Sequence, residues 1–109
     1  MVGKSGAEQG GGLPQIKWLP EALADFERLH DFVYSHSPDA SARAAQTLLD
    51  GAQLLRTSPA LGRLMPDDSE RRELFLPFGV GAYVLRTRLH APETVVIIRI
   101  WHSRENRAE

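Results

Sequence analysis

The sequence contains no cysteine and no long hydrophobic run, and these two absences exclude several classes of protein. Without cysteine the chain forms no disulfide and no thiolate metal site, and a cytoplasmic location is expected. No apolar stretch reaches the roughly 18 residues that span a bilayer. The glycine-rich N-terminus also lacks the apolar segment of a signal peptide. We therefore expect a cytoplasmic protein with no membrane partner.

Lysine is scarce, and arginine supplies most of the positive charge. The formal net charge is −1, but acids outnumber bases between Glu21 and Arg56, whereas arginines outnumber glutamates between Arg71 and Arg107. Arginine makes planar, bidentate contacts with carboxylates and phosphates. The second half of the chain therefore predicts a surface for an anionic partner, and a basic surface that only keeps the protein in solution is the alternative.

Length and composition predict one folded domain. The chain has 109 residues, of which 42% are apolar, and this is room for a single hydrophobic core. Residues 1–14 contain five glycines and few apolar side chains, so we expect them to form a disordered tail. The folded domain is expected to span residues 15–107.

The first part of this domain predicts a strand and two helices. Alternating residues at 15–19 are typical of a short edge strand. Pro20 suits the first turn of a helix, and apolar residues at steps of three and four extend that helix over residues 21–36. Ser37-Pro38-Asp39 begins a second helix, which ends near Thr57. The expected core stripes of the two helices are Leu23, Phe26, Leu29 or His30, and Val33 on the first, and Ala45, Leu48, Ala52 and Leu55 on the second.

Three strand-like runs follow an expected loop at residues 60–70, and they cover residues 71–76, 83–89 and 94–101. Their short connections favour an antiparallel meander. The last run is apolar on both faces and is expected inside the sheet. Its expected faces carry Val96, Ile98 and Ile100 on one side, and Val95, Ile97 and Trp101 on the other, interrupted by Arg99. The predicted fold class is therefore α+β, with one sheet and the helix pair on one of its faces.

Alternation places Arg86 and Arg88 on the same face of their strand, and Arg99 lies on one face of the last strand. If the register brings these faces together, three guanidinium groups stand on the side of the sheet away from the helices. Such a face could hold an acidic peptide, nucleic-acid phosphate or an acidic protein surface. A solvated sheet face, with arginine stems covering apolar surface, is the alternative.

His102, Arg104 and Glu105 follow the last strand. Histidine exchanges protons near neutral pH and arginine can hold a phosphate, so these residue types suit metal-independent RNA cleavage. The alternative is a surface histidine that makes ordinary hydrogen bonds. The other histidines show no metal-ligand spacing, and neither a metal nor a cofactor is expected.

The order of these segments resembles the RelE/ParE superfamily of toxins from type II toxin-antitoxin systems. The resemblance covers residues 15–107 and is carried by WLPEALADFERLHDFV, SPALGR, RRELFLPFGVGAYVLRTR and VVIIRIWHSRENR. It implies a small α+β toxin that inhibits growth of its own cell until a cognate antitoxin, ParD-like or RelB-like, neutralises it. Family antitoxins thread an extended or helical segment around the toxin.

Two mechanisms divide this superfamily. RelE-like members cleave mRNA on the ribosome, and in that case the resemblance assigns the catalytic roles to Arg72, His102 and Arg104. ParE-like members are not enzymes and inhibit DNA gyrase. Val84 stands where nuclease relatives carry arginine, and Leu74 and Leu76 replace an expected lysine pair, so the ParE-like branch is favoured. A degenerate toxin that only binds its antitoxin is a third alternative. The candidate partner-binding residues are Arg63, Arg86, Arg88, Arg99, Trp101 and Arg104.

Overall fold

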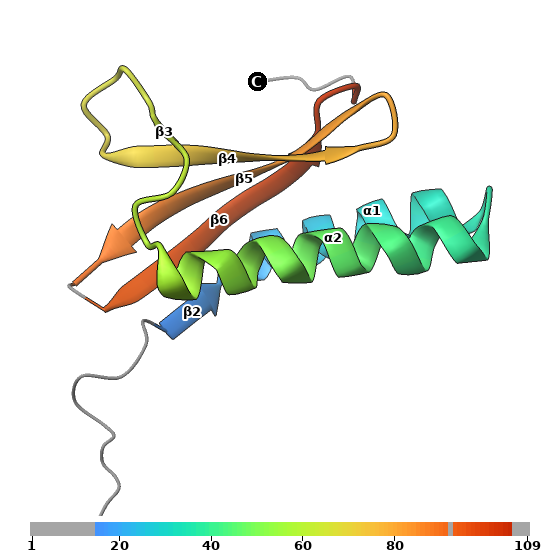
Figure 1. Cartoon of the computed structure of the whole chain (residues 1–109), viewed down its shortest axis with the longest axis horizontal. Helices are drawn as coiled ribbons and strands as arrows, with labels where there is room; N and C mark the ends of the chain where they lie inside the picture. The colour runs from blue at the N-terminus through green and yellow to red at the C-terminus, as the bar shows by residue number, and fades with distance from the viewer. Residues whose placement is uncertain (1–14, 92, 106–109) are drawn as a thin grey trace, which may run out of the picture.

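A computed structural model describes residues 15–91 and 93–105 as two layers, a five-stranded sheet with two helices on one face (Figure 1). The elements are β2 (Gln15–Trp18), α1 (Pro20–Tyr34), α2 (Pro38–Thr57), β3 (Arg63–Leu64), β4 (Arg71–Phe78), β5 (Gly81–His90) and β6 (Thr94–His102). The predicted α+β class, edge strand, helix pair and antiparallel meander are confirmed. The expected tail at 1–14 and the end of the predicted domain at 106–107 lie outside the described residues.

The sheet is mixed, with strand order β2-β6-β5-β4-β3. Strand β2 pairs with β6 in parallel, with Gln15 opposite Thr94 and Trp18 opposite Ile97. The expected loop at 60–70 is corrected in one respect, because it contains β3, which pairs with β4 through Arg63 and Glu73. Two residues are too few to show the alternation by which a strand is predicted.

The helices begin where the sequence predicts. Ser37 caps α2 by accepting a hydrogen bond from the Ala40 N–H at 3.1 Å, which satisfies one of the first amides of the helix. The expected core stripe of α1 is partly wrong, because Leu23 is 54% exposed and the buried residues are Ala22, Asp25 and Leu29. The helix is rotated so that a carboxylate faces the sheet. No helix in the described part of the chain is long and apolar enough to cross a membrane.

The core lies between the helix pair and strands β4, β5 and β6. It consists of Ala22, Leu29, Ala44, Leu48, Ala52, Leu55, Leu74, Leu76, Tyr83, Leu85, Val95, Ile97 and Ile100. Every one of its residues on β4 and β5 is spaced by two, as a half-buried strand requires. Burying this apolar surface is the main term that stabilises the fold.

A bulge in β6 corrects the predicted faces of that strand. Thr87 lies opposite Ile97, but the preceding Arg86 lies opposite Arg99, so Ile98 is an extra residue. The bulge shifts the alternation by one, and Val95, Ile97 and Ile100 are therefore all buried. Strict alternation had placed Ile100 on the face opposite to the other two.

The turn at Gly62 gives a stability prediction. Gly62 has φ +104°, and a Cβ there would lie 3.0 Å from the Glu73 carbonyl oxygen. Both the backbone conformation and the contact disfavour any side chain. We expect Gly62→Ala to lower the free energy of unfolding by about 1–3 kcal/mol in urea titrations. Gly79→Asn is the matched control, because Gly79 has φ +64° and nothing within 4 Å, and asparagine tolerates this conformation. Equal losses for both variants would contradict the prediction.

Candidate functional site

His102 lies at the end of β6, on the helix side of the sheet and next to the β4–β5 turn. Its Nε2 lies 2.9 Å from the Phe78 carbonyl oxygen, and its Nδ1 accepts a hydrogen bond from the Arg104 N–H at 3.2 Å. Since a carbonyl can only accept, Nε2 is the donor in the first of these hydrogen bonds. Both ring nitrogens are therefore occupied within the protein, and neither is open to a substrate.

The residues after His102 bind back to the start of β5. Ser103 donates its N–H to the Ala82 carbonyl at 2.7 Å, and its hydroxyl accepts from the Ala82 N–H at 3.0 Å. This close approach requires Gly81, where a Cβ would lie 2.4 Å from Ser103 Oγ. The end of β6 is thus fixed against the β4–β5 hairpin.

Tyr83 is buried beneath this corner, with its ring 5.0 Å from that of His102 and 5.1 Å from that of Phe78. Burial raises the pKa of the Tyr83 phenol, and the nearby Glu105 carboxylate adds to the rise. The phenol therefore stays protonated at neutral pH. It cannot act as a phenolate base, and its part in this corner is packing.

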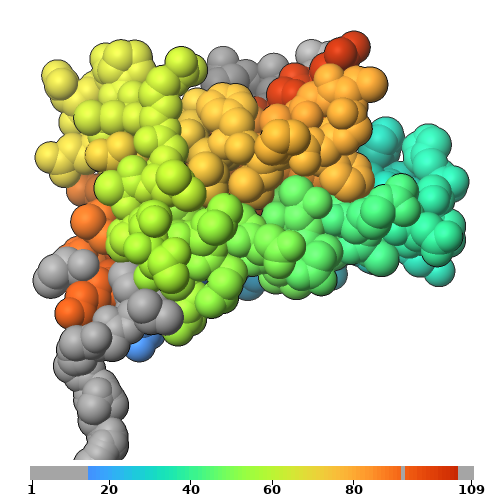
Figure 2. Space-filling view, viewed as in Figure 1, coloured from blue at the N-terminus to red at the C-terminus, as the bar shows by residue number. Residues whose placement is uncertain are grey.

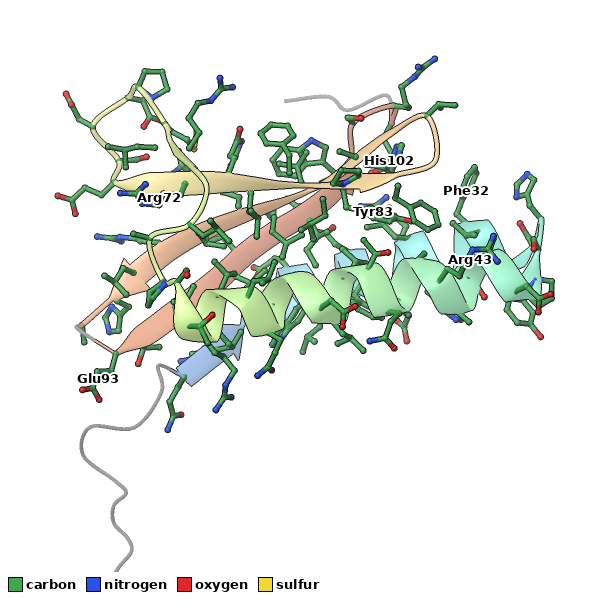
Figure 3. All side chains as sticks on the ribbon, viewed as in Figure 1. Phe32, Arg43, Arg72, Tyr83, Glu93 and His102 are labelled. Atoms are coloured by element: carbon green, nitrogen blue, oxygen red, sulfur yellow. The ribbon has the colours of Figure 1, made fainter. Side chains whose placement is uncertain are left out.

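Arg72 lies at the opposite end of the sheet from His102 (Figure 3). It donates a hydrogen bond to the Gly62 carbonyl at 3.1 Å and so holds the loop before β3. On β5 the residues opposite Arg72 and His102 are Thr87 and Tyr83, which are separated by about 13 Å of strand. Arg104 is exposed at the His102 end. The structure therefore does not bring together the three residues that a nuclease mechanism would use.

The predicted basic face is only partly formed. Arg86 does lie opposite Arg99 in the sheet, but its guanidinium binds the Glu73 carboxylate at 2.8 Å and lies 4.9 Å from the centre of the Trp101 ring. Arg99 binds Asp25 of α1. Of the expected group of three, Arg88 is the exposed member without an ion pair among the described residues.

The other candidate partner-binding residues lie far apart on the molecule. Arg63 is exposed on β3, at the edge of the sheet, and Arg104 is exposed beyond β6. In the sheet, β3 is an edge strand and is separated from β6 by β4 and β5. In the described residues no three His, Asp or Glu side chains lie where they could hold a metal ion.

Asp25 is a central residue that sequence reasoning missed. Beyond Trp18 the strand β2 ends, and Asp25 takes its place beside β6 by accepting from the Ile100 N–H at 2.8 Å. The same carboxylate accepts from Arg99 at 2.8 and 3.1 Å and from Arg28 at 3.2 Å. Burial would raise the pKa of Asp25, but the hydrogen bonds from Arg99 and Ile100 outweigh it and hold the pKa below its usual value. The sequence does contain one signal for this role. Asp25 lies three residues after Ala22 and four before Leu29, which places its side chain on the buried face of α1.

Arg28 and Glu105 extend this network to the end of β6. Arg28 forms an ion pair with Glu105, and Glu105 also accepts from the His102 N–H at 3.0 Å. Helix α1 is thereby joined to the same corner that His102 and Ser103 close against the β4–β5 hairpin. The charged side chains here join α1 to the end of β6, although the Arg28 side chain stays 46% exposed.

An apolar groove opens beside this corner. It encloses about 560 Å³ and is lined mainly by apolar side chains of α1 and the β4–β5 hairpin, with His102, Arg104 and Glu105 at the end of β6. Because its walls come from segments some 50 residues apart, no local pattern could predict it. The groove and the corner beneath it form a candidate binding site.

The chain that adopts this two-layer fold is a toxin of the type II toxin-antitoxin class, as a family model shows. The family model described as "ParE toxin of type II toxin-antitoxin system, parDE" matches residues 16–107. The chain belongs to this family, within the RelE/ParE superfamily that the sequence resembles. Membership implies a cognate antitoxin as its partner.

Individual relatives agree with this assignment. The chain is 38% identical to toxin RelE3 of Caulobacter vibrioides over 87% of its own length and 100% of that protein. It is 37% identical to toxin RelE1 of the same species, over 79% of this chain and 89% of that one. A solved structure described as a chromosomal ParDE toxin-antitoxin system from P. aeruginosa matches with a TM-score of 0.67 and 22% identity, over 83% of this chain and 96% of that chain. This last likeness shows the fold.

Proposed function

We propose that this toxin is ParE-like and stops growth in the cytoplasm by binding DNA gyrase, until a ParD-like antitoxin neutralises it. The observation that carries the proposal is the state of the residues a nuclease would need. His102 is hydrogen-bonded at both ring nitrogens, and Arg72 lies at the other end of the sheet. The description of the matching family model supports the same choice.

Metal-independent RNA cleavage requires a base and an acid within hydrogen-bond reach of the reacting phosphate. Among the described residues, His102 and Arg72 are each hydrogen-bonded to a backbone carbonyl and lie apart along the strands, and Arg104 is exposed beside His102. A protein that acts by binding needs no such constellation, because its work is done by surface complementarity. The geometry therefore favours a binding toxin over an enzyme.

Supercoiling of relaxed plasmid by purified gyrase tests the proposal. We expect the wild-type toxin, separated from its antitoxin, to inhibit supercoiling in a dose-dependent way, and prior addition of the antitoxin to restore it. The control is toxin heated above its unfolding transition. Folded toxin that rebinds its antitoxin but leaves supercoiling unchanged would refute a gyrase target.

Ribosome-dependent mRNA cleavage is the second candidate function. It is favoured by the names of the relatives from Caulobacter vibrioides, toxins RelE1 and RelE3. Translating ribosomes with a labelled mRNA and the same toxin preparation provide the assay. We expect intact mRNA. Cleavage at defined positions would replace the gyrase proposal, and a toxin inactive in both assays that still binds antitoxin would be a degenerate member of the family.

A further inference from the structure

The apolar groove lies at one end of the molecule, where three elements converge. Leu29, Phe32 and Val33 of α1 form one wall, and Phe78, Val80 and the β4–β5 turn form the other. In Figure 2 the orange tip of the β4–β5 hairpin stands above the helices at this end of the surface. Figure 3 shows Phe32, Tyr83 and His102 at the same end, away from Arg72 and Glu93.

Two large apolar side chains on the walls of the groove face solvent. Phe32 is 67% exposed, and Val80, at the tip of the hairpin, is 83% exposed. Hairpin tips are usually occupied by glycine, asparagine or aspartate, so an exposed valine contributes nothing to the turn itself. Exposed apolar side chains that gather beside an apolar groove are typical of a protein-binding surface.

The charge at the rim of the groove is one-sided. Glu105 is held by Arg28 and by the His102 N–H. The Arg104 side chain is exposed and has no carboxylate partner among the described residues. The groove therefore combines apolar walls with the exposed Arg104 guanidinium at its rim. A partner segment that complements it has an apolar side chain next to a carboxylate.

The groove is formed before any partner binds. The hydrogen bonds of His102, Ser103 and Glu105 fix its β6 side to the β4–β5 hairpin, and the Arg28–Glu105 ion pair joins it to α1. A preformed site loses little conformational entropy on binding. A stable interface buries about 800 Å² on each partner. A groove of about 560 Å³ holds only a few side chains, which suits a short anchoring segment.

We propose that the toxin binds gyrase through this groove, which takes up a short apolar segment of the enzyme flanked by an acidic residue. This proposal rests on the proposed function. A second apolar surface, lined by Leu23, Phe26, Ala45 and Leu49 between α1 and α2, shares no lining residue with the groove. The groove, with Phe32 and Val80 as anchors and Arg104 at the rim, is assigned to the target.

Three variants and two matched controls test this assignment in the supercoiling assay. Phe32→Ala and Val80→Ser remove the exposed apolar walls, and Arg104→Glu reverses the rim charge. Phe75→Ala is the control for the aromatic side chain, since Phe75 is exposed on β4 outside the groove, and Lys17→Glu on β2 is the control for the charge. Circular dichroism and thermal unfolding establish that each variant is folded.

We expect Phe32→Ala and Val80→Ser each to raise the toxin concentration for half-inhibition at least about tenfold, as for anchor residues of an interface. Arg104→Glu should raise it several-fold, with a larger effect at low salt, whereas both controls stay within about twofold of wild type. Wild-type inhibition with unchanged groove variants would overturn this assignment and leave the proposed function intact. Groove variants that inhibit normally but no longer bind antitoxin would assign the groove to the antitoxin instead. A wild type without inhibition would refute both proposals.

Discussion

Replacing Asp25 by alanine is expected to remove about 3 kcal/mol from the free energy of unfolding, a large share of the total for a domain of this size. The carboxylate is 4% exposed and accepts hydrogen bonds from Arg99, Arg28 and the Ile100 N–H. Alanine leaves that buried amide without an acceptor at the point where β6 extends beyond its pairing with β2. Urea unfolding followed by circular dichroism measures the loss.

Asp31→Ala is the matched control for this substitution. Asp31 lies on the same helix, its side chain is 74% exposed, and its carboxylate lies 3.4 Å from His30 Nδ1. We expect its removal to change the free energy of unfolding by less than about 0.5 kcal/mol. If the two variants were equally stable, the carboxylate would contribute nothing as a replacement for a neighbouring strand.

The same carboxylate predicts how stability depends on pH. Hydrogen bonding holds the pKa of Asp25 in the folded protein below its usual value, so the folded state favours the charged form. The stabilisation is fully present above the unfolded pKa of about 4 and is lost as pH falls through the lower folded pKa. The difference in urea midpoint between wild type and Asp25→Asn isolates the contribution of this residue from that of the other carboxylates. We expect the difference in urea midpoint to shrink between pH 6 and pH 2.5, and a constant difference would contradict the linkage.

Replacing Tyr83 by alanine is expected to cost about 3–5 kcal/mol, because the ring is buried and its loss leaves a cavity that neighbouring backbone cannot fill. The ring contacts Phe78 and His102, which themselves join the β4–β5 turn to the end of β6. Loss of this ring therefore weakens the floor of the groove as well as the core. Thermal or urea unfolding gives the magnitude.

Two further tyrosine variants separate packing from chemistry. Tyr83→Phe keeps the ring and removes the hydroxyl, and we expect it to cost less than about 1 kcal/mol. Tyr34→Ala removes an exposed ring at the end of α1 and should be nearly neutral. A large loss for Tyr83→Phe would show that the hydroxyl makes a strong polar contact and would overturn the view of this residue as a packing group.

Local sequence determined the elements of this protein. Proline and serine placed the helix starts at Pro20 and Ser37, because their effect on the first turn depends only on neighbouring residues. Short connections fixed the antiparallel meander. The apolar spacing of α1 misplaced Leu23, since periodicity finds an apolar stripe but does not show that Asp25, within that stripe, meets a strand amide some 75 residues later.

Tertiary structure alone decided the site. The bulge at Ile98 changed which side chains of β6 face the core, and only pairing with β5 reveals it. The sequence identified His102 and the arginines by residue type, yet their roles were set by distant partners: the Phe78 carbonyl for His102, Glu73 for Arg86 and Asp25 for Arg99. A hydrogen bond or a groove depends on distances between segments that the fold brings together. The sequence therefore determined the elements and the family of this toxin, and packing decided which of its charged groups remain available to a partner.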